Sequence, residues 1–396
     1  MHICFATLDY QYGKEGGGVG AVTQVLVKTF SQMGWNVSVV GLNQNYKQTS
    51  SDESFQYFTL HQGQIHYYIS KIPIIGELIT LTVRELERSW HLKRILEDIN
   101  KIQNIDIIEF SEEAGFFLRF SSLRKNTKYI VRAHGSEYHW AKAFRTKTNQ
   151  FNLYFQRLLQ KAFFEFCPVI IVPSNFYLGI IKKEISPSLR QKIIKKWNPV
   201  DISIHTGLKK ENLDEDICNS FLFCGRIQDV KGIDLLIKAA SLLKNKYPKL
   251  SIKIAGEFHP TISRNSFYSL LKENKVENNF EILGYLENKK LLNLIKQVRC
   301  VIVPSYWESF GLVGIDTLLL NTSLIHSNVG VFKEINNIPN LLKITPGSVE
   351  ELSNAMQLIL KSKYHYQVNP ETKELRIIKN KLSPIHNYEF YSMLNK

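Results

Sequence analysis

The chain has 396 residues, too many for one ordinary hydrophobic core, so its length predicts two domains of roughly 150–200 residues each. Hydrophobic residues make up 44% of the sequence and charged residues 22%, proportions that exclude a disordered, collagen-like or coiled-coil protein. The formal net charge of +14 is compatible with nucleic acid, an anionic membrane surface or a phosphate-bearing ligand, and does not choose among them.

The cysteines and the N-terminus both indicate a cytoplasmic protein. The cysteines are odd in number and lack a C-x-x-C pair, which predicts small buried side chains rather than disulfides or a zinc site: Cys4, Cys167, Cys218, Cys224 and Cys300. The first apolar run has no basic leader and ends at Asp9, so it does not predict a signal peptide. No apolar stretch approaches the ~20 residues of a membrane span.

Short apolar runs and amphipathic stretches alternate through the first half of the chain. The run Ile3–Leu8 predicts a parallel strand buried on both faces, and the glycine cluster Gly16–Gly20 separates it from a helical stretch that closes near Gly34. Later runs predict four strands and one long amphipathic helix: Trp35–Gly41, Ile105–Phe110, Tyr129–Ala133 and Val169–Val172, then about Phe151 to Phe166.

The same alternation restarts after a polar linker at 198–218. It predicts four strands, at Phe221–Cys224, Ser251–Ala255, Phe280–Leu283 and Val301–Val303, and four helical stretches, at Gly232–Lys244, Ile262–Glu273, Asn288–Val298 and Val349–Leu360. The fold class is therefore α/β, with two Rossmann-like, doubly wound parallel sheets facing each other across a cleft. We place the domains at 1–198 and 199–380, with a tail at 381–396 that packs back on the N-terminal domain.

Two glycine-rich segments after predicted strands have the residue types that bind phosphate. At Gly16–Gly20 the backbone can approach a ligand closely at a helix start, although a flexible surface turn has the same composition. In the segment Gly225–Gly232, Arg226 and Lys231 flank a short loop, so that both reach one pyrophosphate or else stay as two solvated cations. The G-x-G-x-x-G fingerprint is absent, as is the acidic residue that binds ribose in dinucleotide folds, which disfavours a dehydrogenase.

Two further segments end strands with polar side chains. Glu308 follows the strand at Val301–Val303 and can accept hydrogen bonds from ligand hydroxyls, or else act as an ordinary charge at a helix N-terminus. The N–H groups of Phe310, Gly311 and Leu312 lie at the start of the helix that carries Asp316. In the first half, His134 precedes Gly135 at a strand end, where a ligand contact and a structural role are equally expected.

In this order and at these spacings the motifs resemble the large retaining glycosyltransferase family 4, whose members have the GT-B fold. The resemblance spans nearly the whole chain and is most specific between Gly225 and Gly311. It is carried by Gly16-Gly17, His134-Gly135, Gly225-Arg226 with Lys231-Gly232, Ala255-Gly256-Glu257, Gly284-Tyr285, and Pro304-Ser305 with Glu308-Ser309-Phe310-Gly311-Leu312.

The resemblance implies a role for each matched residue. Arg226 and Lys231 would hold the diphosphate of a nucleotide-sugar donor, Glu308 would bind hydroxyls of its sugar, and His134 would lie beside the transferring sugar. The remaining donor-binding residues would be Gly17, Gly18, Gly225, Gly256, Ser309, Phe310, Gly311 and Leu312. The second acid of the family's E-x7-E pair, usually a ribose ligand, is Asp316 here, one methylene shorter than Glu.

The implied activity is retaining transfer of a sugar from a UDP- or GDP-linked donor to a glycan, lipid-linked or small-molecule acceptor, in bacterial surface-polysaccharide or glycoconjugate synthesis. No cofactor and no metal are expected, because basic side chains and helix N–H groups supply the positive charge on the leaving phosphate. The adjacent carboxylates Asp52-Glu53 and Glu112-Glu113 do not match a metal motif and are expected to be solvated. The alternatives are a GT-B nucleotide-sugar epimerase and a non-catalytic sugar-nucleotide-binding homologue.

Basic residues of the first half suggest a peripheral contact with an anionic membrane, although a solvated basic face is an equal alternative. Nucleic-acid binding is not expected, because the aromatic residues do not form a stacking motif. The candidate surfaces are Lys182, Lys183, Arg190, Lys192, Lys195 and Lys196; Arg145, Lys147, Arg157 and Lys161; and the apolar stretch Ile72–Val83 with Arg84 and Arg88.

Overall fold

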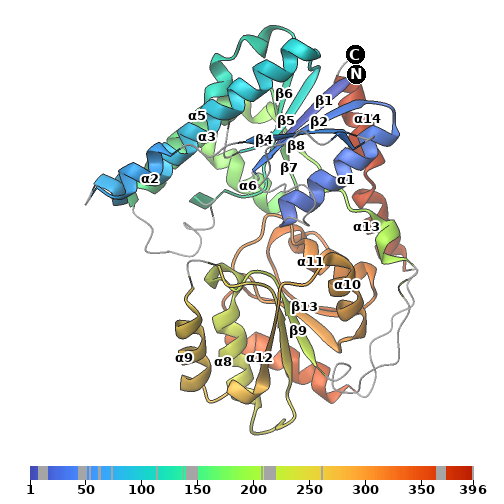
Figure 1. Cartoon of the computed structure of the whole chain (residues 1–396). Coiled ribbons are helices and arrows are strands. Elements are labelled where there is room, and N and C mark those ends of the chain that lie inside the picture. The colour runs from blue at the N-terminus through green and yellow to red at the C-terminus, as the bar shows by residue number, and fades with distance from the viewer. Residues whose placement is uncertain are drawn as a thin grey trace. The chain divides into compact units, whose positions relative to one another are not determined.

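The computed structural model divides the chain into two compact units (Figure 1). The first consists of Met1–Val200 with Leu382–Lys396, and the second of Asp201–Lys381. The boundary between the units after Val200 lies two residues from the predicted domain boundary after residue 198. The C-terminal tail belongs to the first unit. The structure describes residues 1–7, 17–42, 51–52, 55–60, 64–72, 75–112, 115–136, 138–139, 150–206, 208, 220–259, 262–362 and 372–394.

The first unit has an eight-stranded sheet in the order β3-β4-β2-β1-β5-β6-β7-β8. All neighbours in it are parallel except β3 and β4. Its central strands β1 and β5 are buried along their whole length, as parallel strands covered on both faces require, although β5 also carries the charged Glu109. The strands are β1 (His2–Thr7), β2 (Asn36–Leu42), β3 (Ser51–Asp52), β4 (Phe55–Leu60), β5 (Ile107–Ser111), β6 (Lys128–Arg132), β7 (Val169–Val172) and β8 (Ile193–Lys195).

Helices connect these strands and turn their apolar sides to the sheet. Ser174 caps one of them by accepting a hydrogen bond from the N–H of Tyr177. The α-helices are α1 (Gly18–Gln32), α2 (Ile65–Ser70), α3 (Ile75–Ile102), α5 (Gln150–Phe166), α6 (Asn175–Glu184) and α14 (Ile385–Leu394). The 3-10 helices are η1 (Phe116–Phe120), η2 (Ser122–Lys125) and η3 (Pro187–Lys192).

The C-terminal helix α14 is held in the first unit by hydrogen bonds from a buried arginine and by an aromatic cluster. Arg132, fully buried at the end of β6, donates to Glu109 Oε1 at 2.9 Å and to Asn387 Oδ1 at 3.0 Å. Tyr391 packs edge-on against Phe30 of α1, with ring centroids 5.3 Å apart. Figure 1 shows α14 beside α1 accordingly. A buried arginine needs all these partners, because an unpaired charge in a core is strongly destabilising.

The second unit has a six-stranded, wholly parallel sheet in the order β11-β10-β9-β12-β13-β14. The chain runs outward from β9 to β11 on one side and then from β12 to β14 on the other, so the order reverses between β9 and β12. The strands are β9 (Phe221–Cys224), β10 (Ile252–Ala255), β11 (Phe280–Gly284), β12 (Cys300–Val303), β13 (Ser323–Ser327) and β14 (Leu341–Ile344).

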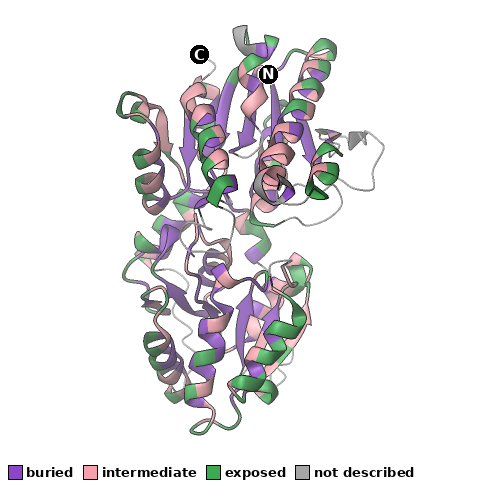
Figure 2. Ribbon diagram, turned by 90° about the vertical axis from the view of Figure 1, so that its left-hand side faces the viewer, coloured by how far each residue is buried: buried purple, intermediate pink, exposed green. Residues whose placement is uncertain are grey.

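The helices of this unit cover the sheet and leave its strands buried, as Figure 2 shows for both units. Two of them begin at a serine whose hydroxyl accepts an N–H of the first turn, Ser263 and Ser348. The helices are α8 (Ile233–Leu243), α9 (Arg264–Glu273), α10 (Asn288–Gln297), α11 (Leu312–Leu319), α12 (Val349–Lys361) and α13 (Lys373–Leu382). The 3-10 helices are η4 (Ile202–His205), η5 (Asp229–Lys231), η6 (Glu277–Asn279) and η7 (Gly330–Lys333).

The predicted α/β class and the two parallel sheets are confirmed, and the predicted strands lie within two residues of β1, β2, β5, β6, β7, β9, β10, β11 and β12. The strands β3, β4, β8, β13 and β14 were not predicted. Four of the cysteines are buried and unbonded, and Cys218 lies outside the described residues. In the described part of the chain, no helix is both long and apolar enough to cross a membrane.

Candidate active site

The residues predicted to bind the donor in the second unit gather where its strand order reverses. Lys231 follows β9 and Glu308 follows β12, and these two strands are neighbours in the sheet. The Nζ atom of Lys231 lies 2.7 Å from Oε1 of Glu308. In open α/β sheets this reversal point leaves a crevice at the carboxyl ends of the strands, where ligands bind.

Backbone contacts lock the two loops together. The φ angle of Gly232 is +73°, and a Cβ built on it would lie 2.1 Å from the carbonyl oxygen of Pro304. The N–H of Tyr306 donates to the carbonyl of Val230 at 2.9 Å. A residue with a side chain would force the loops apart, so the glycine is required for Lys231 to reach Glu308.

Glu308 is ionised in a partly enclosed position, with its side chain 14% exposed. Its Oε1 accepts hydrogen bonds from Lys231 and from the hydroxyl of Ser305, at 2.7 and 2.8 Å. Burial by itself raises the pKa of this carboxyl. The charge of Lys231 and the two hydrogen bonds outweigh that effect and bring the pKa below its ordinary value.

Backbone hydrogen bonds join the loop after β9 to the loop after β10, and the loop after β10 to the loop after β11. The N–H of Gly225 donates to the carbonyl of Ala255, and the N–H of Gly256 to that of Gly284, at 2.9 and 2.8 Å. A Cβ on Gly256 would lie 1.9 Å from the carbonyl oxygen of Gly225. Arg226, in the first of these loops, has an exposed side chain and makes no hydrogen bond or ion pair with any other described residue.

The segment after Glu308 leads into α11 as predicted. Phe310 is buried, while Ser309 and Leu312 are half-buried, and Gly311 is the N-cap of α11. The carbonyl of Phe310 accepts the N–H of Val331 at 3.0 Å, which ties this segment to the loop after β13. The first N–H groups of a helix lack intrahelical partners, so the start of α11 offers donors to an anion.

Asp316 on α11 has a partner that the sequence did not reveal. Nε2 of His205, in η4, donates to Oδ1 of Asp316 at 2.8 Å. The His205 side chain is 2% exposed and that of Asp316 is 23% exposed. Burial raises the pKa of Asp316, and the hydrogen bond from His205 opposes that rise. His205 therefore fixes the carboxylate that replaces the usual glutamate.

The second residue missed in the sequence is Glu112, which was expected to be solvated and is instead buried at 4% exposure. It directly follows β5, and its carboxylate accepts the N–H groups of His134 at 2.7 Å and of Gly135 at 2.6 Å. The hydroxyl of Tyr177 donates to Oε1 at 3.0 Å. Its position at a strand end was the available signal. The other three carboxylates of these pairs, Asp52, Glu53 and Glu113, have no described side chain.

His134 lies at the carboxyl end of β6, as predicted, and is half-buried. Burial, with a smaller contribution from the charge of Arg132, lowers the pKa of His134 to about 3. The imidazole is therefore neutral at physiological pH. Gly17 and Gly18 lie at the start of α1, after β1, and both are exposed.

The basic residues predicted to form surfaces in the first half lie on several elements, and some of them are paired with an acid. Arg84 and Arg88 do not form an open patch, since Arg84 Nε and Arg88 Nη1 lie 3.5 and 3.1 Å from Oε1 of Glu85. Arg145 and Lys147 lie outside the described residues. The remaining basic residues lie on or after α5 and α6 or on η3 and β8. Among described side chains, no three His, Cys, Asp or Glu residues are grouped as metal ligands.

Each half of the chain matches a model of a known protein family. The model of Glycosyltransferase Family 4 matches residues 16–201, and that of Glycosyl transferases group 1 matches residues 208–380. The glycogen synthase of Mycobacterium tuberculosis is 27% identical over 140 residues, which are 35% of this chain and 33% of that protein. The chain thus matches about a third of the length of this relative.

Solved structures of other proteins are similar in fold to this chain over nearly its full length. Sucrose-phosphate synthase from Thermosynechococcus elongatus superposes with a TM-score of 0.78 at 17% identity, covering 99% of this chain and 98% of that one. HepE of Anabaena, in complex with UDP and glucose, has a TM-score of 0.69 at 16% identity, covering 100% and 99%. These likenesses show the fold. With the two family models, which together span both units, they show that the chain belongs to the group 1 glycosyltransferases of family 4 and has the GT-B fold.

Proposed function

We propose that this glycosyltransferase moves a sugar from a nucleoside-diphosphate sugar to a hydroxyl-bearing acceptor, with retention of the anomeric configuration and without a metal ion. The acceptor is a glycan, a lipid-linked glycan or a small molecule. UDP is the first nucleotide to test, because the similarly folded HepE was solved with UDP and glucose. The observation that carries the proposal is the meeting of Lys231 and Glu308 where the strand order of the second unit reverses.

The diphosphate has three sources of positive charge in this unit. Arg226 is exposed after β9, Lys231 ends the same loop, and the N-terminus of α11 follows the neighbouring strand β12. Without donor, Lys231 is neutralised by Glu308. When the diphosphate binds, Lys231 turns part of its hydrogen bonding to phosphate oxygen, and Glu308 is left to accept hydroxyls of the sugar.

Bond cleavage leaves negative charge on the departing phosphate, and fixed donors stabilise this charge without reorganising. Removing one such donor typically costs about 3–4 kcal/mol of transition-state stabilisation. We assign no protein nucleophile. The acceptor attacks from the face that the phosphate leaves, and the departing phosphate takes the acceptor's proton. His134 serves as a neutral hydrogen-bonding group beside the sugar, because its pKa of about 3 keeps it uncharged.

Thermal unfolding of the purified chain with UDP, GDP, ADP, dTDP and CMP, each with and without EDTA, tests the donor site. A ligand at 100 times its Kd adds about 2.7 kcal/mol of stability. We expect one nucleoside diphosphate to stabilise the protein equally in EDTA. Stabilisation that EDTA abolishes would contradict metal independence, and no response to any nucleotide would favour a non-catalytic homologue.

Arg226→Ala tests the assignment more narrowly. This side chain has no partner among the described residues, so its loss should leave folding intact while weakening nucleotide binding and lowering kcat/KM at least 100-fold. Lys290→Ala is the matched control, because Lys290 is an exposed cation of the same unit. Product analysis of the wild type separates transfer from epimerisation, since an epimerase changes the sugar without needing an acceptor.

A further inference from the structure

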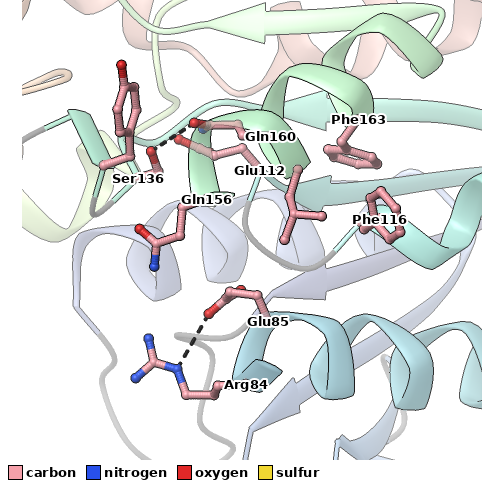
Figure 3. A pocket seen from close by; sticks show the side chains of 11 residues that line it. Arg84, Glu85, Glu112, Phe116, Ser136, Gln156, Gln160 and Phe163 are labelled. Atoms are coloured by element: carbon pink, nitrogen blue, oxygen red, sulfur yellow. Dashed lines mark hydrogen bonds and ion pairs between the residues drawn. The ribbon is translucent and has the colours of Figure 1, made fainter. Parts of the chain in front are cut away.

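The first unit contains a pocket that none of the donor-binding residues lines. Its empty space is about 550 Å³ when the solvent at its open mouth is included. Residues of α3, α5, η1 and the segments after β5 and β6 line it, among them Arg84, Glu85, Phe116, Gln156, Gln160 and Phe163. Figure 3 shows the amides of Gln156 and Gln160 on one side and the rings of Phe116 and Phe163 on the other.

Among the described residues, two buried amide atoms in this wall find no hydrogen-bond partner. Gln160 is 7% exposed, and its Oε1 accepts from the Ser136 hydroxyl at 3.2 Å, which leaves Nε2 unpaired. Gln156, one helical turn earlier on the same face of α5, has an unpaired Oε1. In the described wall, the unpaired donor Gln160 Nε2 therefore lies one helical turn from the unpaired acceptor Gln156 Oε1. Buried amide groups normally find partners, so both atoms point to a ligand.

The combination of donor and acceptor selects among ligand types. A hydroxyl group both donates and accepts, so two neighbouring hydroxyls satisfy Gln156 and Gln160 together. A phosphate only accepts and would leave Gln156 Oε1 unpaired, and an ammonium only donates and would leave Gln160 Nε2 unpaired. The charged lining residues that the structure describes are Arg84, Glu85 and Glu112, so this part of the lining has no excess of positive charge to attract an anion.

The pocket borders the segment that carries His134. Glu112 lines the pocket, and the same carboxylate holds the N–H groups of His134 and Gly135. Ser136, which also lines it, follows Gly135 directly. A ligand seated here thus lies next to the segment assigned to the transferring sugar, which is where an acceptor belongs.

We propose that this pocket binds an uncharged, hydroxyl-rich glycosyl group of the acceptor. The hydroxyls bond to Gln156 and Gln160, and the apolar face of the sugar ring packs on Phe116 and Phe163. The identification of this group as acceptor rests on the proposed function; the binding of a neutral sugar does not.

Ligand-observed NMR on the full chain, with UDP present and absent, tests the pocket. The probes are methyl α-glucoside, methyl α-galactoside and methyl α-mannoside, with glucose 6-phosphate and glucosamine as charged counterparts. We expect at least one neutral glycoside to bind more tightly than either charged sugar. Gln156→Leu and Gln160→Leu should each raise its Kd about tenfold, the usual effect of losing one hydrogen bond in a buried site. Gln150→Leu, an exposed position on α5, is the matched control and should not change the Kd.

Three results would overturn the proposal: tighter binding of a charged sugar, no binding of any neutral glycoside, or a Kd that neither glutamine substitution changes. Gln156→Leu guards against misfolding, because Gln156 is only half-buried and its Oε1 has no partner to lose. The nucleotide experiment separates the two proposals. If no nucleotide stabilises the protein but the glutamines still govern glycoside binding, the donor assignment fails and the pocket stands; the reverse result removes only the pocket.

Discussion

The two acids of the candidate site in the second unit each accept a hydrogen bond from a nitrogen-bearing side chain. Lys231 neutralises Glu308, and His205 holds Asp316, so both acids are fixed before any ligand arrives. Preorganised groups of this kind stabilise a transition state without reorganisation at the moment of reaction. Each pair can be tested separately by substitution, because removing one side chain leaves the other partly buried and without that partner.

Substituting Lys231→Ala or Glu308→Gln should lower kcat/KM for the donor by 100-fold or more. The alanine removes a cation from the leaving phosphate, and the amide replaces an ionic acceptor of sugar hydroxyls with a neutral one. Nucleoside-diphosphate release from the donor measures the effect. The exposed pair Lys290 and Glu287 provides controls that should keep wild-type turnover. Turnover within threefold of wild type in either site variant would remove that residue from the mechanism.

Asp316→Glu should destabilise the protein, although it restores the side chain usual in the family. The extra methylene moves the carboxylate away from Nε2 of His205, and a buried donor left without its acceptor costs about 1–3 kcal/mol. Thermal unfolding without ligand measures the loss. If Asp316→Glu unfolds at the wild-type temperature, the contact with His205 contributes nothing to stability.

His326 should make the fold acid-sensitive. It is fully buried on β13, stacked on Phe332 with centroids 3.6 Å apart. Burial lowers the pKa of His326 from 6.5 to about 4. Below pH 6.5 the unfolded chain therefore takes up a proton that the folded chain refuses. The contribution of neutral His326 to the free energy of unfolding is fully present above pH 6.5. It falls by about 1.4 kcal/mol per pH unit as the pH is lowered toward 4.

Denaturant titrations at pH 7 and pH 5 measure this contribution. His326→Phe keeps a stacking ring but cannot titrate, so the difference in unfolding free energy between variant and wild type should move by about 2 kcal/mol in the variant's favour at pH 5. An equal decline in both proteins would show that other groups cause the acid sensitivity.

At the scale of the element, the sheet of the second unit brings distant loops together through close backbone contacts. Gly232 at the start of α8 lies against Pro304 after β12, and Gly256 after β10 lies against Gly225 after β9. The strands deliver the loops to one edge of the sheet, and these contacts set the final spacing between Lys231 and Glu308.

Gly232→Ala should therefore cost both stability and activity. The new Cβ would meet the carbonyl oxygen of Pro304 at 2.1 Å, and φ of +73° is itself strained for alanine, so we expect a loss of roughly 2 kcal/mol or more. Gly179→Ala is the control, because this exposed helical glycine has open space around its Cβ. It should gain about 0.5–1 kcal/mol in thermal unfolding. A neutral Gly232→Ala would show that the loops can separate freely.

At the scale of the whole molecule, the chain leaves the first unit at Val200 and returns to it at Leu382. The second unit is thus continuous, whereas the first is completed by α14. The charge of Arg132 is shared among Glu109, Asn387 and Tyr391, two of which lie on that last helix.

Expressing the two units as separate fragments should show that the second folds without the rest of the chain, whereas the first needs α14. Residues 201–381 expressed alone should fold cooperatively, because all six strands of the described sheet lie within them. Residues 1–200 alone leave Arg132 without Asn387 and Tyr391 and should unfold at a lower temperature than the same fragment with a peptide of residues 382–396. If the peptide has no effect, α14 is not needed to complete the first unit.

The sequence by itself determined the strand-helix alternation, the two sheets and the strand-end glycines, acids and bases, because apolar runs and glycine clusters are local patterns. The strands β4 and β13 have no such local pattern. The run Phe55–Leu60 mixes polar and aromatic residues, and Ser323–Ser327 buries two serines and a histidine. Buried polar residues lack an apolar pattern, so their strands became evident only in the sheet.

Only the tertiary structure decided which side chains meet. His205 and Asp316 are 111 positions apart, Arg132 and Asn387 are 255 apart, and Glu112 belonged to a pair expected to be in water. The pocket beside Gln156 and Gln160 depends on α3, α5 and η1 together. Such contacts follow from how elements pack, and no local pattern encodes that packing, whereas a strand or a loop is encoded in the residues that form it.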